Sequence, residues 1–391
     1  MAIPLKTKTA SRVLHVVEKL DRGAIENWLL RMLVHARARR IGLDWTFYCA
    51  VGLPGVIDEK IRGLGTGIVY SPVSLGRKVA FMRALRAELS RGAYDVLHCH
   101  HDLMSAVYLA ASAGLPIRRR LVHVHNADEA LPTPSPLKNW LYREPMRQLC
   151  LRTADRVVGI SNHTLDTFLA GRRRRPGRDV VHYYGVDPQR FADLRPHKAQ
   201  FRRELELADD ALILLFGGRM VREKNPVFTV DVLAALRRRE PRAVAVFAGS
   251  GALEDAIRAR ARALDIDGAV RMLGWRSDLP EIMVNSDWFI LPHPEHPVEG
   301  FGLAVIEAQL GGLRLLISRG VADDPLLPTA RFRRLLLSDN ADEWAAAAVG
   351  LLAESEPSVP DTFAALARSP MDMDRALGDL LGLHGDIAKN E

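Results

Sequence analysis

The sequence predicts an α/β protein with two doubly wound parallel sheets, one in each half of the 391-residue chain. Short apolar runs alternate with longer amphipathic segments, and strands that alternate with helices assemble into parallel sheets. This alternation stops at the polar stretch 188–203 and then begins again. The chain is also too long for a single hydrophobic core. We therefore expect two domains, residues 1–190 and 191–370, facing each other across a cleft, followed by a helix in residues 371–391 that could return to the first domain.

Seven strands are expected in the first half. Each is a short run rich in apolar and β-branched residues, as in sheets that helices cover on both faces. The runs occupy residues 11–17, 44–49, 68–70, 94–102, 120–126, 154–160 and 179–184. Helices are expected between them, at residues 27–40, 56–64, 75–91, 103–113, 132–149 and 164–170. Ser161 is a good N-cap for the last helix, because its hydroxyl can accept a hydrogen bond from a free helix amide.

The second half repeats the pattern after residues 188–203, which are predicted to be an irregular linker. Strands are expected at residues 211–216, 243–248, 270–273, 288–291 and 314–318, with helices at 227–238, 253–264 and 279–285. Pro226 suits the first turn of its helix, where an amide proton would have no helical partner. Residues 336–391 are expected to hold further helices.

Residues 288–312 carry the strongest functional signal of the chain. An apolar strand is followed by a proline-rich loop, by Gly300 and Gly302, and by an apolar helical segment. A strand end, a glycine turn and a helix start form an anion site, because free amides point outward along the positive end of the helix. Glu299 is placed in the loop and Glu307 about one turn into the helix, and carboxylates accept hydrogen bonds from hydroxyls. Phosphate and hydroxyl binding together indicate a sugar nucleotide, although each glutamate alone is also compatible with a solvated charge.

Charge is unevenly distributed along the chain, whose net charge is +7. Residues 1–187 carry 29 Lys and Arg against 16 Asp and Glu, whereas residues 188–391 carry 25 against 31. The basic helices of the first half bear Arg31, Arg37, Arg39, Arg40, Arg77, Lys78, Arg83 and Arg86. Because a basic amphipathic face attracts anionic headgroups, we expect this half to bind an anionic or lipid-linked acceptor at a membrane surface. The alternative is that these charges are simply solvated.

The compartment is indicated by three features. Cys49, Cys99 and Cys150 are widely spaced without a CxxC pair, as in a reduced cytosolic protein. The first residues lack the apolar core of a signal peptide, and no uncharged apolar run approaches the ~18 residues that span a bilayer. We expect a cytoplasmic protein, or one that is peripheral at the inner membrane face.

Five histidines lie within residues 98–125, at the ends of two expected strands: His98, His100, His101, His123 and His125. A His-x-His pair in a strand places both rings on one face, as metal ligands require. No Asp, Glu or Cys nearby has clear ligand spacing, so a metal site is the less favoured interpretation. We favour one histidine lining the cleft while the others pack or face solvent.

The chain resembles the retaining glycosyltransferases of family 4 over nearly its whole length. The resemblance rests on Gly218-Arg219-x4-Lys224, on Gly249-x-Gly251 and on Glu299-x7-Glu307, which occur in this order. It implies the GT-B fold, in which two doubly wound Rossmann-like domains face each other across a cleft. It also implies catalysis without a metal ion or a cofactor.

The resemblance assigns roles to residues of the second half. Arg219 and Lys224 would hold the diphosphate of a nucleotide-sugar donor, with Gly218 and Gly249 in the same loops. Glu299 would bind hydroxyls of the transferred sugar and Glu307 the ribose. Main-chain donors would come from the segment between these two glutamates: Gly300, Phe301, Gly302 and Leu303.

The first half would complete the site. His125 matches a histidine beside the reacting centre, and Gly23 lies in a loop that approaches the donor phosphate. The catalytic set is therefore His125, Arg219, Lys224 and Glu299.

The function implied is transfer of a sugar from a nucleotide-diphosphate sugar to a glycan or lipid-linked acceptor in bacterial polysaccharide assembly, with no role for nucleic acid. A nucleotide-sugar epimerase of the same fold and a non-catalytic scaffold partner of another transferase are the alternatives. A glycosidase would use two carboxylates but would leave the two cations unexplained.

Overall fold

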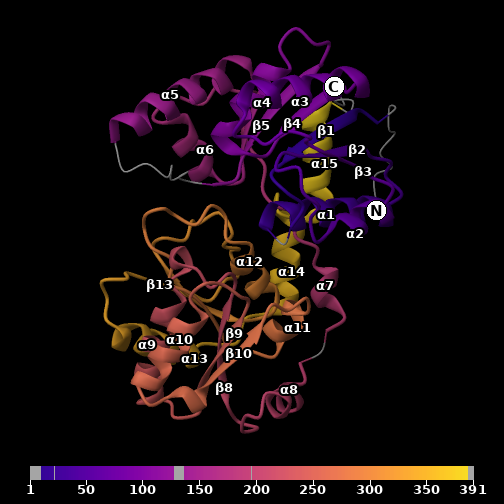
Figure 1. Cartoon of the computed structure of the whole chain (residues 1–391). Coiled ribbons are helices and arrows are strands. Elements are labelled where there is room, and N and C mark those ends of the chain that lie inside the picture. Colours follow the sequence, from indigo (N-terminus) through magenta and orange to yellow (C-terminus); the bar gives the residue numbers. More distant parts are fainter. Residues whose placement is uncertain (1–9, 22, 127–135, 195, 386–391) are drawn as a thin grey trace. The chain divides into compact units, whose positions relative to one another are not determined.

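The computed structural model describes residues 10–21, 23–126, 136–194 and 196–385, and it divides the chain into two compact units (Figure 1). Unit 1 consists of Met1–Gly185 together with Met373–Glu391, and unit 2 consists of Val186–Asp372. The first boundary between the units therefore lies at Gly185–Val186, whereas the sequence analysis placed it after residue 190.

Unit 1 is built on one parallel sheet of seven strands in the order β3-β2-β1-β4-β5-β6-β7. The strands are β1 (Arg12–Val17), β2 (Asp44–Cys49), β3 (Gly67–Tyr70), β4 (Val96–Cys99), β5 (Arg119–Val124), β6 (Arg156–Gly159) and β7 (Asp179–Val181). The helices are α1 (Ala24–Ala38), α2 (Asp58–Gly63), α3 (Lys78–Gly92), η1 (Asp102–Met104), α4 (Ser105–Ala111), α5 (Pro136–Thr153), α6 (Asn162–Leu169) and α15 (Met373–His384).

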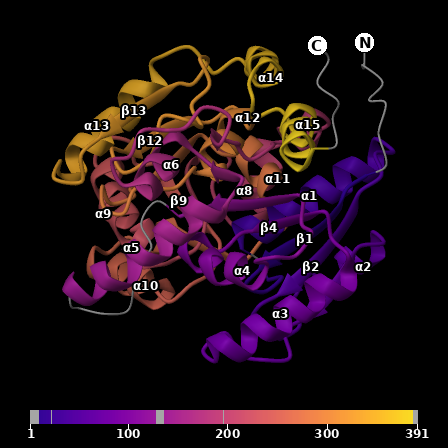
Figure 2. The same cartoon turned by 90° about the horizontal axis from the view of Figure 1, so that it is seen from above.

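Helix α15 lies beside α1 in both views of the chain (Figures 1 and 2). Asp374 holds the two helices together, since its carboxylate pairs with Arg39 at 2.6 Å and with the ring of His35 at 2.7 Å. The last helix expected from the sequence therefore belongs to unit 1, although it follows unit 2 in the chain.

Unit 2 is built on a parallel sheet of six strands in the order β10-β9-β8-β11-β12-β13. The strands are β8 (Leu212–Gly217), β9 (Ala243–Ala248), β10 (Val270–Gly274), β11 (Trp288–Leu291), β12 (Arg314–Ser318) and β13 (Phe332–Leu335). The helical segments are α7 (Gln189–Ala192), α8 (Lys198–Glu204), η2 (Arg222–Lys224), α9 (Pro226–Arg237), α10 (Glu254–Ala263), η3 (Asp267–Ala269), α11 (Leu279–Val284), α12 (Leu303–Leu310), α13 (Ala341–Leu352) and α14 (Val359–Arg368).

Both sheets reverse their strand order once, between β1 and β4 in unit 1 and between β8 and β11 in unit 2. In such sheets ligands bind outside the carboxyl ends of the strands at this reversal, where the flanking loops turn to opposite faces. The two reversals therefore mark the places where each unit can hold a ligand.

One expectation from the sequence is wrong, and one strand was not predicted. Residues 188–203 are not an irregular linker but contain α7 and most of α8, because Phe191 and Phe201 are buried. Strand β13 was missed, since its sequence Phe-Arg-Arg-Leu lacks an apolar run. Tertiary packing outweighs local composition at both places.

Ser161 caps α6 as predicted. Its hydroxyl accepts a hydrogen bond from the amide of Thr164 at 3.1 Å, and the Thr164 hydroxyl accepts one from the Ser161 amide at 3.0 Å. Helix α1 instead begins three residues before its predicted start, at Ala24, which brings Glu26 into its first turn.

Candidate active site

The sheet reversal of unit 2 gathers the residues that the sequence singled out there. Arg219 and Lys224 follow β8, and Glu299 follows β11, the strand paired with β8. Gly249 follows β9, on the other side of β8. Residues far apart in the sequence thus meet because parallel strands end at one edge of the sheet.

The glycines allow the loops to approach closely. A Cβ on Gly249 would collide with the carbonyl oxygen of Gly218, and a Cβ on Gly251 would collide with that of Met220. Only glycine fits at these two contacts. The loop after β8, which carries Arg219, therefore rests directly on the loop after β9.

Lys224 forms an ion pair with Glu299, and both side chains are largely buried. Burial, reinforced by the charge of Arg219, lowers the pKa of Lys224 to about 7. His293, which the sequence analysis did not select, lies 3.6 Å from the same Glu299 oxygen. Burial lowers the pKa of His293 to about 4, so this ring is neutral at pH 7. The exposed Arg219 and the paired Lys224 together make a cationic group beside one carboxylate.

The segment after Glu299 turns into α12 as expected. Gly302 is the N-cap of α12 with φ +81°, a left-handed conformation that favours glycine. Phe301 is buried, so this residue can offer a ligand only its main chain. The amides that open α12 are the groups to which the sequence analysis assigned anion binding.

Glu307 is on α12 and is buried, with its carboxylate 2.5 Å from the guanidinium of Arg190 on α7. The loop position of Glu299 and the helical position of Glu307 agree with the sequence analysis, but Arg190 was missed. The start Asp187-Pro188 is a helix-opening signal that could have identified α7, because the Asp187 carboxylate accepts a bond from the Gln189 amide at 2.9 Å. Nothing in the sequence indicated its pairing with a residue more than a hundred positions away.

In unit 1, His125 follows β5 and is buried, and both of its ring nitrogens are hydrogen-bonded. Its Nε2 bonds His100 at 3.0 Å and its Nδ1 bonds the Tyr184 hydroxyl at 2.7 Å. Burial, and to a smaller degree His182, lowers the pKa of His125 to about 3. His125 is therefore a neutral ring whose nitrogens are occupied within unit 1.

Gly23 is the N-cap of α1 and is extended, with φ −72° and ψ 167°. The Glu26 carboxylate lies directly against Gly23, so that a Cβ at this position would require the Glu26 side chain to move. The side chain of Glu26 thus folds back over the start of its own helix.

Seven histidines of unit 1 form a buried cluster of hydrogen bonds and ring contacts, called here the histidine cluster: His15, His98, His100, His123, His125, His182 and His384. One row links His15 to His100 at 2.9 Å and continues to His125 and Tyr184. A second row links His384, His98 and His123 at 3.0 and 3.1 Å. The two rows lie against each other, with ring centroids 4.1 Å apart for His98 and His100.

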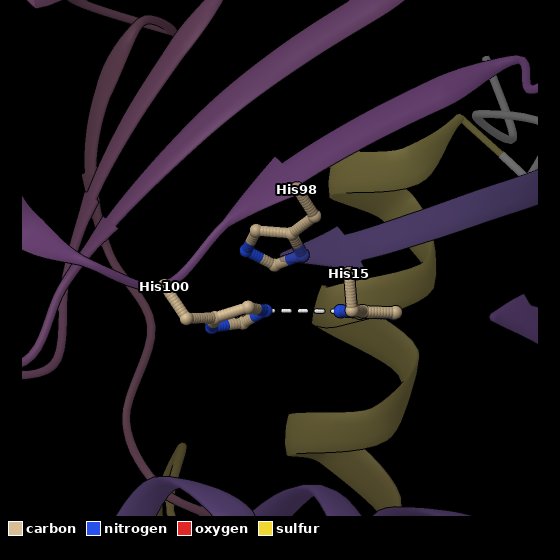
Figure 3. A group of neighbouring side chains, drawn as sticks. All are labelled: His15, His98 and His100. Carbon is tan, nitrogen blue, oxygen red and sulfur yellow. Dashed lines mark hydrogen bonds between the residues drawn. The ribbon is translucent and has the colours of Figure 1, made fainter. Parts of the chain in front are cut away.

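Two groups in this cluster bring three ring nitrogens within 4.8 Å of one another: His15, His98 and His100, and His100, His123 and His125. Figure 3 shows His98 lying above the hydrogen-bonded pair His15 and His100. A metal needs lone pairs that converge in the ring planes. Both nitrogens of His98 and both nitrogens of His100 instead bond neighbouring histidines, so neither of these rings has a nitrogen left for a metal.

The sequence analysis expected the other histidines to pack or to face solvent, and the structure shows which of them pack. His98, His100 and His123 pack inside unit 1, and the half-buried His101 bonds the Tyr108 hydroxyl at 2.8 Å. His15, His182 and His384 also belong to this cluster, but the sequence analysis did not identify them, because they lie far from residues 98–125 in the sequence.

Comparisons with known proteins agree with this architecture. Residues 25–190 match the model "Glycosyltransferase Family 4", and residues 197–357 match "Glycosyl transferases group 1". The chain is 28% identical to the putative glycosyltransferase EpsF of Bacillus subtilis, covering 95% of this chain and 96% of that protein.

Two further relatives cover about two thirds of the chain. A D-inositol 3-phosphate glycosyltransferase of Actinosynnema mirum is 31% identical over 68% of this chain and 69% of that protein. The UDP-Gal:alpha-D-GlcNAc-diphosphoundecaprenol alpha-1,3-galactosyltransferase of Escherichia coli is 25% identical over 68% of each chain.

Among solved structures, Anabaena Alr3699/HepE in complex with UDP and glucose matches with a TM-score of 0.73 and 18% identity, covering 96% of this chain and all of that one. The fold is therefore GT-B, with one Rossmann-like sheet in each unit. The chain belongs to the family 4 glycosyltransferases.

Proposed function

We propose that the chain transfers a sugar from a nucleotide-diphosphate sugar to a hydroxyl of a glycan or lipid-linked acceptor, with retention at the anomeric carbon and without a metal ion. The observation that supports this most is the grouping of Arg219, Lys224, Glu299 and the start of α12 at one sheet edge of unit 2. The group combines phosphate-binding cations and amides with a carboxylate that accepts from hydroxyls.

Arg219 and Lys224 bind the donor diphosphate in this proposal and stabilise the charge that builds on it as it leaves. Lys224 pairs with Glu299. Donor binding would exchange this pairing for one between Lys224 and the diphosphate, and it would free the Glu299 carboxylate for sugar hydroxyls. Glu307 binds the ribose, oriented by Arg190.

Retention in this proposal comes from attack on the leaving-group face, without a covalent intermediate. Glu299 and Glu307 are assigned to hydroxyls, so neither serves as a nucleophile. The acceptor oxygen attacks the anomeric carbon from the face that the diphosphate leaves. The bond from that carbon to the diphosphate oxygen breaks, and the departing phosphate oxygen takes the acceptor proton.

His125 keeps a part in the proposal, but as a positioning residue. Its ring holds the Tyr184 hydroxyl, and its amide donates to Asp102 at 2.7 Å. It would thereby fix the loops that follow β4 and β5. Direct contact with a substrate would require one of its two ring hydrogen bonds to break.

A UDP-sugar donor and an undecaprenyl-type diphosphate acceptor are the substrates that we propose. The HepE complex contains UDP, and the name of the Escherichia coli relative specifies UDP-Gal and a diphosphoundecaprenol acceptor. The basic helices α1 and α3 would hold the enzyme at an anionic membrane surface. None of the helices in the described residues combines the length and apolar composition that crossing a bilayer requires.

The test is incubation of the purified protein with a panel of nucleotide sugars. We expect slow hydrolysis of one donor, with release of the nucleotide diphosphate and of the sugar in its original anomeric form, read by NMR within minutes of mixing. An inverted sugar or a trapped glycosyl-enzyme would refute retention. An epimerised donor without hydrolysis would favour the epimerase, and an inert protein would favour the scaffold.

A further inference from the structure

His293 lies in the proline-rich loop after β11, and its main chain is held in place by the segment that follows β12. Its carbonyl accepts a hydrogen bond from the Ser318 hydroxyl, and a Cβ on Gly320 would collide with the same carbonyl oxygen. The Gly320 carbonyl in turn accepts from the Glu299 amide at 2.7 Å. The two ends of the loop, His293 and Glu299, are therefore fixed on one support.

The ring of His293 has a defined tautomer. Its Nδ1 lies 2.9 Å from the carbonyl oxygen of Pro294, and because a carbonyl can only accept, Nδ1 carries the hydrogen. Burial keeps the ring neutral at pH 7, so its other nitrogen, Nε2, has a lone pair and no proton. Nε2 is thus an acceptor of hydrogen bonds.

This acceptor lies beside a second one. Nε2 is 3.6 Å from a carboxylate oxygen of Glu299, which is too long for a hydrogen bond, and neither atom has a proton to share. The His293 side chain is only 5% exposed, and none of the described residues donates a hydrogen bond to Nε2. A buried acceptor without a donor costs free energy, so the pair calls for donors from another group.

Lys224 stands in for such a group in the free protein. Its ammonium pairs with Glu299, and after burial its charge is a further cause of the lowered pKa of His293. In the proposed function this ammonium moves to the donor diphosphate. The two acceptors are then left without a donor at the place where the transferred sugar is expected.

We propose that Glu299 and His293 together bind two neighbouring hydroxyls of the transferred sugar, one donating to the carboxylate and the other to Nε2. A single hydroxyl has one hydrogen and satisfies only one acceptor, so two hydroxyls are needed. Acceptors 3.6 Å apart suit hydroxyls on adjacent ring carbons. The inference rests on the proposed function for the place of the sugar, and it adds a substrate class: sugars with an unmodified vicinal diol facing this loop.

A structural role for His293 is the competing explanation, in which the ring only fills space under the loop. Phenylalanine, which has a similar size, would then be tolerated, or it would weaken binding of free UDP and of the intact donor alike. In neither case would the effect depend on which hydroxyls the donor carries.

The experiment is calorimetry with UDP, UDP-glucose and UDP-galactose, followed by analogues of the tighter-binding sugar in which fluorine replaces one hydroxyl at a time. Fluorine is similar in size but cannot donate. In the wild type, replacement at two adjacent carbons should lower the affinity, about tenfold for the hydroxyl on Glu299 and about fivefold for the one on His293. His293→Phe should remove the second penalty only, and UDP should bind as it does to the wild type.

Two further variants separate chemistry from size. In His293→Gln the amide oxygen can take the place of Nε2, so the fivefold penalty should return. His296→Phe, at an exposed histidine of the same loop, is the matched control and should keep both penalties.

Nitrogen NMR of the wild type tests the same contact without turnover. The signal of the unprotonated Nε2, assigned by its loss in His293→Gln, should shift with the intact donor and not with UDP. Both penalties in a protein that hydrolyses no donor would uphold the diol site and reject the proposed transfer. Penalties on carbons that are not adjacent, an Nε2 signal that ignores the donor, or equal losses of UDP and donor in His293→Phe while transfer persists would overturn the inference alone.

Discussion

The two sheet reversals of this molecule have the same architecture and opposite chemistry. In unit 2 the loops present Arg219 and Lys224 beside a single carboxylate, Glu299. In unit 1 they present three carboxyls and two imidazoles around a cavity: Glu18, Glu26, Asp102, His100 and His101. A parallel sheet brings loops together at its carboxyl edge whatever their composition, so the loop residues alone decide what is bound. The cationic edge is suited to a diphosphate and the acidic edge to hydroxyls.

The interiors of the two units differ as well. Unit 1 buries the histidine cluster between its sheet and α15, whereas the buried charge of unit 2 is paired, as in Asp287 with Arg202 and Lys198 at 2.9 and 2.8 Å. Paired charges keep their partners over a wide pH range. Buried neutral histidines are sensitive to acid instead, because each ring must stay unprotonated while the unit is folded.

The largest expected effect is selective loss of unit 1 at acidic pH. Burial lowers the pKa of His125 and of His384 to about 3, and those of His15, His98, His100 and His123 well below 6.5. The unfolded chain therefore binds more protons, so stability is full above pH 6.5 and falls as the pH drops toward the folded values. At pH 5 each such histidine costs about 2 kcal/mol, against a total of roughly 5–15 kcal/mol for a domain.

Hydrogen exchange read by mass spectrometry, corrected for intrinsic rates, measures both units in one sample. We expect protection in the strands of unit 1 to collapse between pH 6.5 and pH 5, before that of unit 2. His384→Gln should reduce the steepness of this loss by about one proton, whereas His163→Gln, outside the cluster, should not. Equal acid sensitivity of both units would contradict the account.

The second effect concerns the cations of unit 2. Arg219→Ala and Lys224→Ala should each lower turnover by roughly 10²–10³, the loss expected when one preorganised electrostatic partner of a leaving group is removed. Arg222→Ala, an exposed cation in the same loop, is the matched control. Steady-state kinetics with the active donor measure the turnover. Losses below tenfold in both variants would contradict the assignment of Arg219 and Lys224 to the donor diphosphate.

The third effect separates the two glutamates. Glu299→Gln should weaken binding of the intact donor by roughly 10–100-fold, since a charge-assisted hydrogen bond contributes about 1.5–3 kcal/mol, and should leave the free nucleotide diphosphate nearly unaffected. Glu307→Gln should weaken both ligands. Calorimetry measures the affinity of each variant for the two ligands. The control is Glu295→Gln, in the proline-rich loop that also carries Glu299. Similar losses of both ligands in the Glu299 variant would reject this division.

The smallest effect concerns the membrane. Arg37 bonds the Gly63 carbonyl and Arg39 pairs with Asp374, whereas Arg77 and Arg83 make no ion pair within the described residues. Each basic residue near an anionic surface contributes about 1 kcal/mol. Replacing Arg77, Lys78 and Arg83 by glutamine should therefore reduce flotation with anionic vesicles more than replacing Arg37, Arg39 and Arg40. A wild-type protein that ignores these vesicles at low salt would exclude the membrane role.

Local sequence was sufficient for most of the fold and for the edge of unit 2. Apolar runs located β8 and β11, and the glycines and cations after them stand in contiguous motifs. Long-range partners were not predictable: Arg190 pairs with Glu307 in unit 2, and Asp374 joins α15 to α1 in unit 1, each across a long sequence separation. The cavity of unit 1 was missed for the same reason: burial at a sheet edge raises the pKa of Glu26 to about 7, and no short motif encodes that burial.

The contrast between the two edges is tested most directly by calorimetry with UDP at pH 8 on the wild type, Lys224→Ala and Glu26→Gln. Because the pKa of Lys224 is about 7, UDP binding to the wild type should take up a proton, seen as a heat that changes with the ionisation enthalpy of the buffer. We predict that Lys224→Ala loses both the proton uptake and most of the affinity, while Glu26→Gln keeps both. Tight binding without proton uptake in Lys224→Ala, or an equal loss in Glu26→Gln, would contradict the assignment of the diphosphate to unit 2.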